Sequence, residues 1–228
     1  MSEPIGIIAG GGMLPIMIAR GVRAAGNRVV AAGMAGQYRE DFPAECDEFV
    51  RVGVLRVGEW ARKLRQRGVK RAVMIGAVDK ASLMYMPFWR RALVMRPDWI
   101  VAKLWYRVLR HDKRSQTLLA AVADELGRAG IELMDSTHYI PEHLSAPGVM
   151  TARPPTAAQR EDVAFGWPIL LQMNAMEIGQ AIAVRSHDVV AVEAVEGTDA
   201  MIRRAGELVG GRSRKEDGGW TLLKGAGE

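Results

Sequence analysis

Short apolar runs alternate with segments of helical spacing through the first 135 residues. Residues 5–9 have the pattern of a buried strand, and apolar positions at helical spacing follow the glycines after it. The same order of strand and helix repeats further along the chain. Further strands are predicted at residues 28–32, 49–52, 71–75 and 131–134, and further helices at 58–67 and 115–126. This alternation predicts an α/β fold with a Rossmann-like parallel sheet over residues 1–135.

The pattern changes after residue 135. Residues 136–155 hold four prolines and little periodicity, which is typical of a linker or a surface loop. Residues 156–228 are then expected to form a second, smaller α/β domain. It looks truncated, because its last predicted strand, residues 218–224, has no later element to cover it.

The second domain is predicted to open with a long helix. Thr156 begins it, Pro168 kinks it, and it runs to about residue 176. A hairpin then pairs residues 179–184 with 188–195 across residues 185–188. The helix side chains expected to face inward are Ala157, Val163, Ile169, Leu170 and Met173.

Three carboxylates gather where the hairpin's second strand passes into the next helix. Glu193, Glu196 and Asp199 are spaced three residues apart, and Thr198 is a good N-cap. Such a group would hold a hard cation such as Mg²⁺ against a phosphate. The alternative is that Asp199 helps to cap the helix while both glutamates face water. The spacing alone leaves both interpretations open.

A glycine turn at residues 10–12 leads into the first predicted helix. Backbone N–H groups at such a helix start suit a phosphate, although a tight strand-to-helix turn needs the same glycines. Pro15 stands where a dinucleotide fingerprint has its third glycine, and no acidic residue follows the second strand, so NAD is not expected. Lys80 follows a strand's carboxyl end, where it either reaches a phosphate or lies in solvent.

The positive charge is concentrated in one region. The net charge is +5, and residues 88–114 alone contribute +6 from eight basic and two acidic residues. Aromatic side chains are interleaved with them over residues 83–114. The mixture suits an acylated anion or a membrane surface, a single-stranded nucleic acid, or a helix with aromatics inside and arginines in water. No RNA-binding motif accompanies it, so nucleic acid is the least favoured ligand.

The single cysteine, Cys46, excludes a disulfide framework and a multi-thiolate zinc site, which favours a reducing compartment. No segment has the length of a membrane span and no signal peptide is expected at the start. These features predict a cytoplasmic protein.

Three stretches together resemble one family. They are IIAGGGMLP at residues 7–15, IGQAIAV at 178–184 and VAVEAVEGTDAMI at 190–202. In this order and spacing the chain is similar to the LpxI-type UDP-2,3-diacylglucosamine pyrophosphatases of lipid A biosynthesis. The resemblance covers essentially the whole chain, and its EGTDAM piece is the most specific.

The resemblance implies a Mg²⁺-dependent hydrolase at the inner face of the inner membrane. It would convert UDP-2,3-diacylglucosamine into UMP and 2,3-diacylglucosamine 1-phosphate, with the lipid held between the two domains. A homodimer is compatible with it, and nucleic acid is not a partner. Carried onto this sequence, it implies substrate binding by Gly10, Gly11, Gly12, Met13, Leu14, Gly76, Lys80, Gln180 and Thr198, catalysis by Asp199 and Lys224, and metal binding by Glu193, Glu196 and Asp199.

The sequence departs from the family pattern in three places. Glu177 replaces an aspartate, and RSQTLL at residues 114–119 lacks two acids. An Arg-x-Asp-x-Pro segment that supplies a catalytic aspartate is expected soon after Lys224 and has no counterpart before Glu228. We therefore expect binding of the UDP-sugar with weak or absent hydrolysis. The alternative is a non-catalytic protein that binds UDP-sugar or lipid at the membrane surface.

Overall fold

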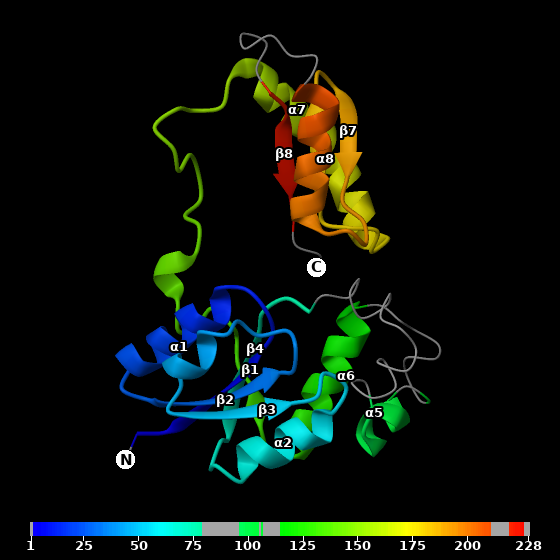
Figure 1. The fold of residues 1–228 in the computed structure, drawn as a ribbon. Helices are drawn as coiled ribbons and strands as arrows, with labels where there is room; N and C mark the ends of the chain where they lie inside the picture. The colour runs from blue at the N-terminus through cyan, green and yellow to red at the C-terminus, as the bar shows by residue number, and fades with distance from the viewer. Residues whose placement is uncertain (1, 79–95, 105, 107–114, 211–218, 226–228) are drawn as a thin grey trace. The chain divides into compact units, whose positions relative to one another are not determined.

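The computed structural model describes residues 2–78, 96–104, 106, 115–210 and 219–225 (Figure 1). The chain divides into two compact units, unit 1 (Met1–Leu144) and unit 2 (Ser145–Glu228). The division falls inside the segment expected to be a linker. Each unit has its own sheet and its own buried core.

Unit 1 is built on a five-stranded parallel sheet. Its strands are β1 (Pro4–Ala9), β2 (Arg28–Met34), β3 (Glu48–Val52), β4 (Arg71–Ile75) and β5 (Glu132–Leu133), in the order β3-β2-β1-β4-β5. The central strand β1 is buried from Ile5 to Ala9, as expected for a parallel strand covered on both faces. The predicted α/β class and parallel sheet are confirmed.

Helices cover both faces of this sheet (Figure 1). On one face α1 (Leu14–Ala24) packs Ile16 and Ile18 against Ile5 and Ile7. On the other, α2 (Val57–Arg65) and α6 (Ser115–Arg128) enclose Ile8. The short elements are η1 (Phe42–Glu45), α5 (Trp99–Leu104) and η3 (Pro141–His143). Because strand and helix alternate, the carboxyl ends of the strands meet at one sheet edge, where open α/β sheets bind ligands.

Unit 2 is a three-stranded antiparallel sheet between two helices. The strands β6 (Ala181–Arg185), β7 (Asp188–Val192) and β8 (Thr221–Lys224) lie in the order β7-β6-β8. One face packs on α7 (Ala157–Ala175) and the other on α8 (Thr198–Gly210). Successive side chains of a strand point to opposite faces, so Ile182 and Val184 meet α7 while Ala181 and Ala183 meet α8.

The hairpin and the start of α7 follow local sequence signals. Ser186 and His187 both have positive φ, 52° and 61°, as a two-residue type I′ turn requires. Thr156 caps α7 and forms a reciprocal capping box with Gln159. The predicted inward face of α7 is wrong at two positions, since Ala157 and Val163 are exposed, and Asp162 next to Val163 is buried.

Candidate functional site

The glycine turn of unit 1 is used partly to join two strand ends. The N–H of Gly10 donates to the carbonyl of Ile75 at 2.8 Å, and that of Gly11 to the carbonyl of Ala77 at 2.7 Å. A Cβ on Gly10 would lie 2.6 Å from the Ala77 oxygen, so only glycine fits there. Gly76 has φ +101° and packs against Gly10 in the same way. Gly10, Gly11 and Gly76 therefore hold the β1 and β4 ends together, and the N–H groups of Gly10 and Gly11 are already occupied.

The next three backbone N–H groups are available. Among the described residues, no hydrogen-bond acceptor faces the N–H of Gly12, Met13 or Leu14. Gly12 has φ +92° and open space where a Cβ would point. These groups lie at the N-terminus of α1, whose dipole attracts anions. The expected phosphate cradle thus narrows to Gly12, Met13 and Leu14.

Apolar side chains flank this cradle. Met13 and Leu14 are 46% and 44% exposed, which is high for large apolar residues at an ordered turn. Backbone N–H groups at a helix start, beside exposed apolar side chains, suit a ligand that combines phosphate with hydrocarbon. The predicted phosphate contact of Lys80 lies outside the described residues.

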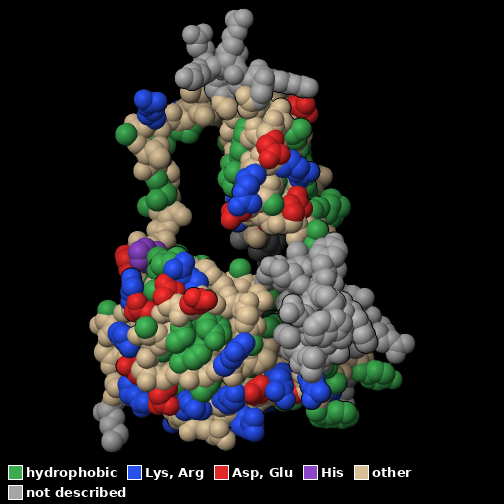
Figure 2. Space-filling view, in the orientation of Figure 1, with side chains coloured by type: hydrophobic (Ala, Val, Ile, Leu, Met, Phe, Trp, Pro, Cys, Tyr) green, Lys and Arg blue, Asp and Glu red, His purple; other side chains and the backbone are tan. Residues whose placement is uncertain are grey.

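The aromatic and basic stretch is only partly described. Trp99 is 82% exposed, whereas Leu104 in the same helix is buried. Asp98 fixes the start of this helix and of α2 by accepting from the N–H groups of Val101 and Gly58 at 2.9 and 2.7 Å. On the face of unit 1 in Figure 2, side chains of both charge signs are intermixed over the described surface.

At the acidic turn of unit 2, the structure brings Glu193, Thr198 and Lys224 together. The Lys224 ammonium donates to Thr198 Oγ1 at 2.9 Å, and the Thr198 hydroxyl donates to Glu193 Oε1 at 2.9 Å. Thr198 is the first residue of α8 and not the residue before it, as the expected N-cap would be. Its hydroxyl links Lys224 of β8 to the buried Glu193. Lys224 is exposed, and Gln180 lies beside it because its carbonyl accepts from the N–H of Gly225.

The predicted three-carboxylate metal site does not form. No three His, Cys, Asp or Glu side chains of the described residues are placed to hold a metal ion. Glu196 accepts from Arg204 at 2.9 Å and from the N–H of Ala194 at 3.1 Å. Glu193 is only 6% exposed and is bonded to Thr198. Asp199 is exposed and is the only member of the trio without a partner in the described part of the chain.

The backbone of Glu193 is held at two points. Its N–H donates to the carbonyl of Ala181 at 2.9 Å. A Cβ on Gly179 would lie 2.0 Å from the Glu193 carbonyl oxygen, so the IGQ stretch needs its glycine for this close approach. Two of the stretches that carry the family resemblance, residues 178–184 and 190–202, therefore meet at Glu193.

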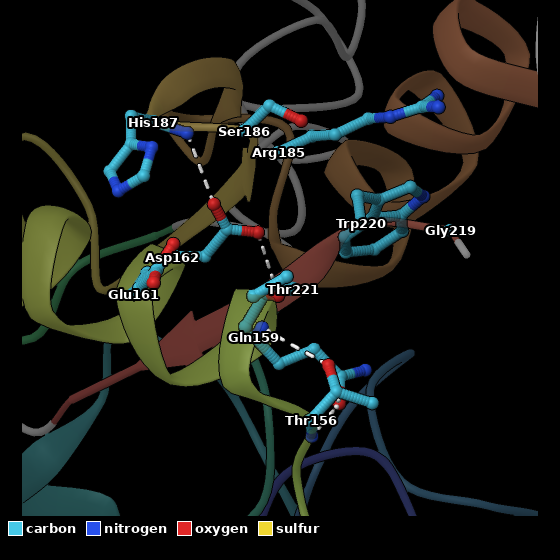
Figure 3. Close-up of a pocket in the computed structure, with 11 residues that line it drawn as sticks. Thr156, Gln159, Glu161, Asp162, Arg185, Ser186, His187, Gly219, Trp220 and Thr221 are labelled. Carbon is cyan, nitrogen blue, oxygen red and sulfur yellow. Dashed lines mark hydrogen bonds between the residues drawn. The ribbon is translucent and has the colours of Figure 1, made fainter. Parts of the chain in front are cut away.

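A cavity of about 490 Å³ lies at the other end of the unit 2 sheet (Figure 3). The register Ala181↔Lys224 and Val184↔Thr221 separates the two ends. In this cavity Asp162 accepts from the N–H of His187 at 3.1 Å and from the Thr221 hydroxyl at 3.2 Å. Asp162 is not among the site residues predicted from the sequence, although it shares the helical spacing of the buried Gly166, Leu170 and Met173. Asp162 ties α7 to the hairpin turn and to β8.

Among the described residues, no helix has the length and hydropathy required to span a bilayer.

Comparison with known proteins gives two domain matches. Residues 4–143 match the LpxI N-terminal domain and residues 146–227 match the LpxI C-terminal domain. The chain is also similar to the UDP-2,3-diacylglucosamine pyrophosphatase LpxI of Caulobacter vibrioides, with 28% identity over 90% of this chain and 69% of that protein.

Solved structures are matched only loosely. One is a nucleoside-diphosphate-sugar epimerase from Pseudomonas aeruginosa, with 20% identity, coverage of 58% of this chain and 51% of that chain, and a TM-score of 0.32. Another is a biotin carboxylase from Campylobacter jejuni, with 9% identity, coverage of 99% and 45%, and a TM-score of 0.36. TM-scores this low carry no conclusion about fold or function. The two domain matches together span nearly the whole sequence, and the chain belongs to the LpxI family.

Proposed function

We propose that this protein hydrolyses the pyrophosphate bond of UDP-2,3-diacylglucosamine, giving UMP and 2,3-diacylglucosamine 1-phosphate in lipid A biosynthesis. The observation that carries the proposal is the match of both units to the domains of one family. The name of the Caulobacter vibrioides relative supplies the substrate. Cytoplasmic action at the inner membrane face, by transient contact with the membrane surface, is part of the same proposal.

Two groups of this chain suit a diphosphate ester. The N–H groups of Gly12, Met13 and Leu14 would bind phosphate oxygens, and the adjoining apolar side chains would contact acyl chains. In unit 2, Lys224 offers an exposed ammonium. As water attacks a phosphorus, such donors stabilise the negative charge that develops on the phosphate oxygens.

Magnesium remains part of the proposal, with one carboxylate ligand from the protein in place of the three predicted from the sequence. The described residues do not offer a three-carboxylate cage, and Asp199 is the exposed carboxylate of the turn that has no partner among them. Mg²⁺ commonly binds through one or two carboxylates together with substrate phosphates and water. Asp199 would hold the ion in this way, and the ion would supply Lewis-acid stabilisation of phosphate oxygens.

The test is UMP release from UDP-2,3-diacylglucosamine in detergent micelles. We expect UMP formation that is weak, as the departures from the family pattern predict, that depends on Mg²⁺ and is lost in EDTA, and that decreases at least about tenfold in Asp199→Asn. Glu207→Gln is the matched control, since Glu207 is another exposed acid of α8. Binding of the substrate without UMP formation would instead support a non-catalytic protein, and absence of both would refute the proposal.

A further inference from the structure

The Lys224 ammonium is held at a fixed place by a relay of hydrogen bonds. It donates to Thr198 Oγ1 at 2.9 Å, and Thr198 in turn donates to Glu193 Oε1 at 2.9 Å. An ammonium has no lone pair, so the direction of both bonds is settled: Thr198 accepts from Lys224 and gives its only proton to Glu193. These two hydrogen bonds restrain the Lys224 side chain, which is long and would otherwise be mobile.

The far end of the relay is rigid. Lys224 and Ala181 are paired across β8 and β6, which puts the lysine on the sheet face that α8 covers. Glu193 is buried, its N–H is bonded to Ala181, and Gly179 packs against its carbonyl. The anchoring carboxylate therefore has little freedom to turn toward a ligand.

The same burial argues against Glu193 as a metal ligand. Its second oxygen, Oε2, is buried and has no hydrogen-bond partner in the described part of the chain. A hard cation needs an oxygen that it can reach together with its waters, whereas Oε2 faces the interior. The cation placed at this turn is the Lys224 ammonium, whose two remaining N–H groups have no partner among the described residues.

We propose that Thr198 and Glu193 are positioning residues, which hold the Lys224 ammonium against a phosphate oxygen of a nucleoside diphosphate by a contact that does not pass through magnesium. This inference rests on the proposed function, because the diphosphate belongs to the UDP-sugar. It changes the roles expected from the sequence: Thr198 binds the lysine instead of the substrate, and Glu193 binds Thr198 instead of a metal.

The test is the affinity of the full chain for UDP and for pyrophosphate, measured by calorimetry in Mg²⁺ and again in EDTA. Lys224→Met should weaken UDP binding by about tenfold, as for loss of one charge-assisted contact. Thr198→Val should weaken it by several-fold, and Thr198→Ser, which keeps the hydroxyl, should stay within about twofold of the wild type. Each factor should be the same with and without Mg²⁺.

Lys70→Met, at an exposed lysine of unit 1, is the matched control and should leave UDP affinity unchanged. Urea unfolding of each variant separates a folding defect from a binding defect. Equal affinities in the wild type and Lys224→Met, or a Thr198→Val effect present only with Mg²⁺, would overturn the inference and leave the proposed function standing. A wild-type chain that binds neither UDP nor pyrophosphate would overturn both.

Discussion

Asp162 and Glu193 are the two buried carboxylates among the residues of unit 2 that the structure describes, and they lie at opposite ends and opposite faces of its small sheet. Each is 6% exposed. Both oxygens of Asp162 accept hydrogen bonds, from the hairpin backbone and from Thr221. Among the described residues, Glu193 accepts at one oxygen only, from Thr198, and its other oxygen has no partner. The two carboxylates are therefore equally buried but differ in how completely they are hydrogen-bonded.

The partners explain the difference. The hydrogen-bond partners of Asp162 belong to the fold itself, so its removal deletes two hydrogen bonds that join α7 to the hairpin turn and to β8. Glu193 accepts from the Thr198 hydroxyl, which accepts in turn from the exposed Lys224 ammonium. Glu193 therefore orients a positive charge that faces solvent. A buried acid whose oxygens are all hydrogen-bonded stabilises the fold. A buried acid with an oxygen that lacks a hydrogen bond costs stability and indicates a functional site.

The largest effect is expected for Asp162→Ala. Two hydrogen bonds to a charged acceptor are lost, each contributing about 1.5 kcal/mol, so the free energy of unfolding should fall by about 3 kcal/mol. Urea unfolding followed by circular dichroism measures it. The control is Glu161→Ala at the exposed neighbouring acid, which should change stability by less than about 0.5 kcal/mol. A similar loss in both variants would mean that the pairing of Asp162 is unimportant.

A smaller loss of stability is expected for Glu193→Ala. One hydrogen bond disappears, but a buried oxygen without a partner disappears as well, so the net fall should be about 1 kcal/mol. UDP affinity should fall several-fold in this variant and stay unchanged in Asp162→Ala where the protein remains folded. If Glu193→Ala destabilises as strongly as Asp162→Ala, the contrast between the two acids is wrong.

Magnesium alone should have almost no effect on stability. Asp199 alone would bind Mg²⁺ weakly, so Mg²⁺ at an added concentration no higher than its dissociation constant would contribute at most about 0.4 kcal/mol, or about 1 °C in Tm. Thermal unfolding with and without Mg²⁺ measures this directly. A larger rise that vanishes in Glu193→Ala or Glu196→Ala would restore the metal site predicted from the sequence.

Neither Asp162→Ala nor Glu193→Ala should change the alkylation of Cys46, which lies in unit 1 and serves as an internal reference. Burial raises the pKa of this thiol to about 12, so the reactive thiolate is scarce in the folded chain. The stability contributed by the neutral thiol is present below its unfolded pKa and is lost as the pH rises through the folded value. Alkylation of Cys46 at pH 8 should be slow and equal in the wild type, Asp162→Ala and Glu193→Ala. Faster labelling in either variant would show that the substitution also disturbs unit 1.

Local signals predicted much of the fold. The strand–helix alternation placed the parallel sheet, Thr156 marked the start of α7, and residues 185–188 marked the hairpin turn. The site was harder to predict, because it depends on contacts between distant residues. Spacing suggested that Glu193, Glu196 and Asp199 would share a cation, but Arg204 and Thr198 take up the two glutamates instead. No local pattern tells which side chain a carboxylate will meet.

The glycine turn at residues 10–12 also depends on contacts with distant residues. Its glycines are predicted from the sequence to offer a row of N–H groups to phosphate, yet Ile75 at the end of β4 and Ala77 just after it, more than sixty residues away, accept from Gly10 and Gly11. Sheet pairing of this kind is long-range and cannot be read from the turn itself. What remains for a ligand is the part of the turn that begins at Gly12.

The most direct test of this account is acetylation of lysines followed by mass spectrometry, with and without saturating UDP. The account predicts that UDP slows acetylation of Lys224 in the wild type and in Thr198→Ser, has a much smaller effect on it in Thr198→Val, and leaves Lys70 unchanged in all three. Unaltered acetylation of Lys224 in a wild-type chain saturated with UDP would contradict the account.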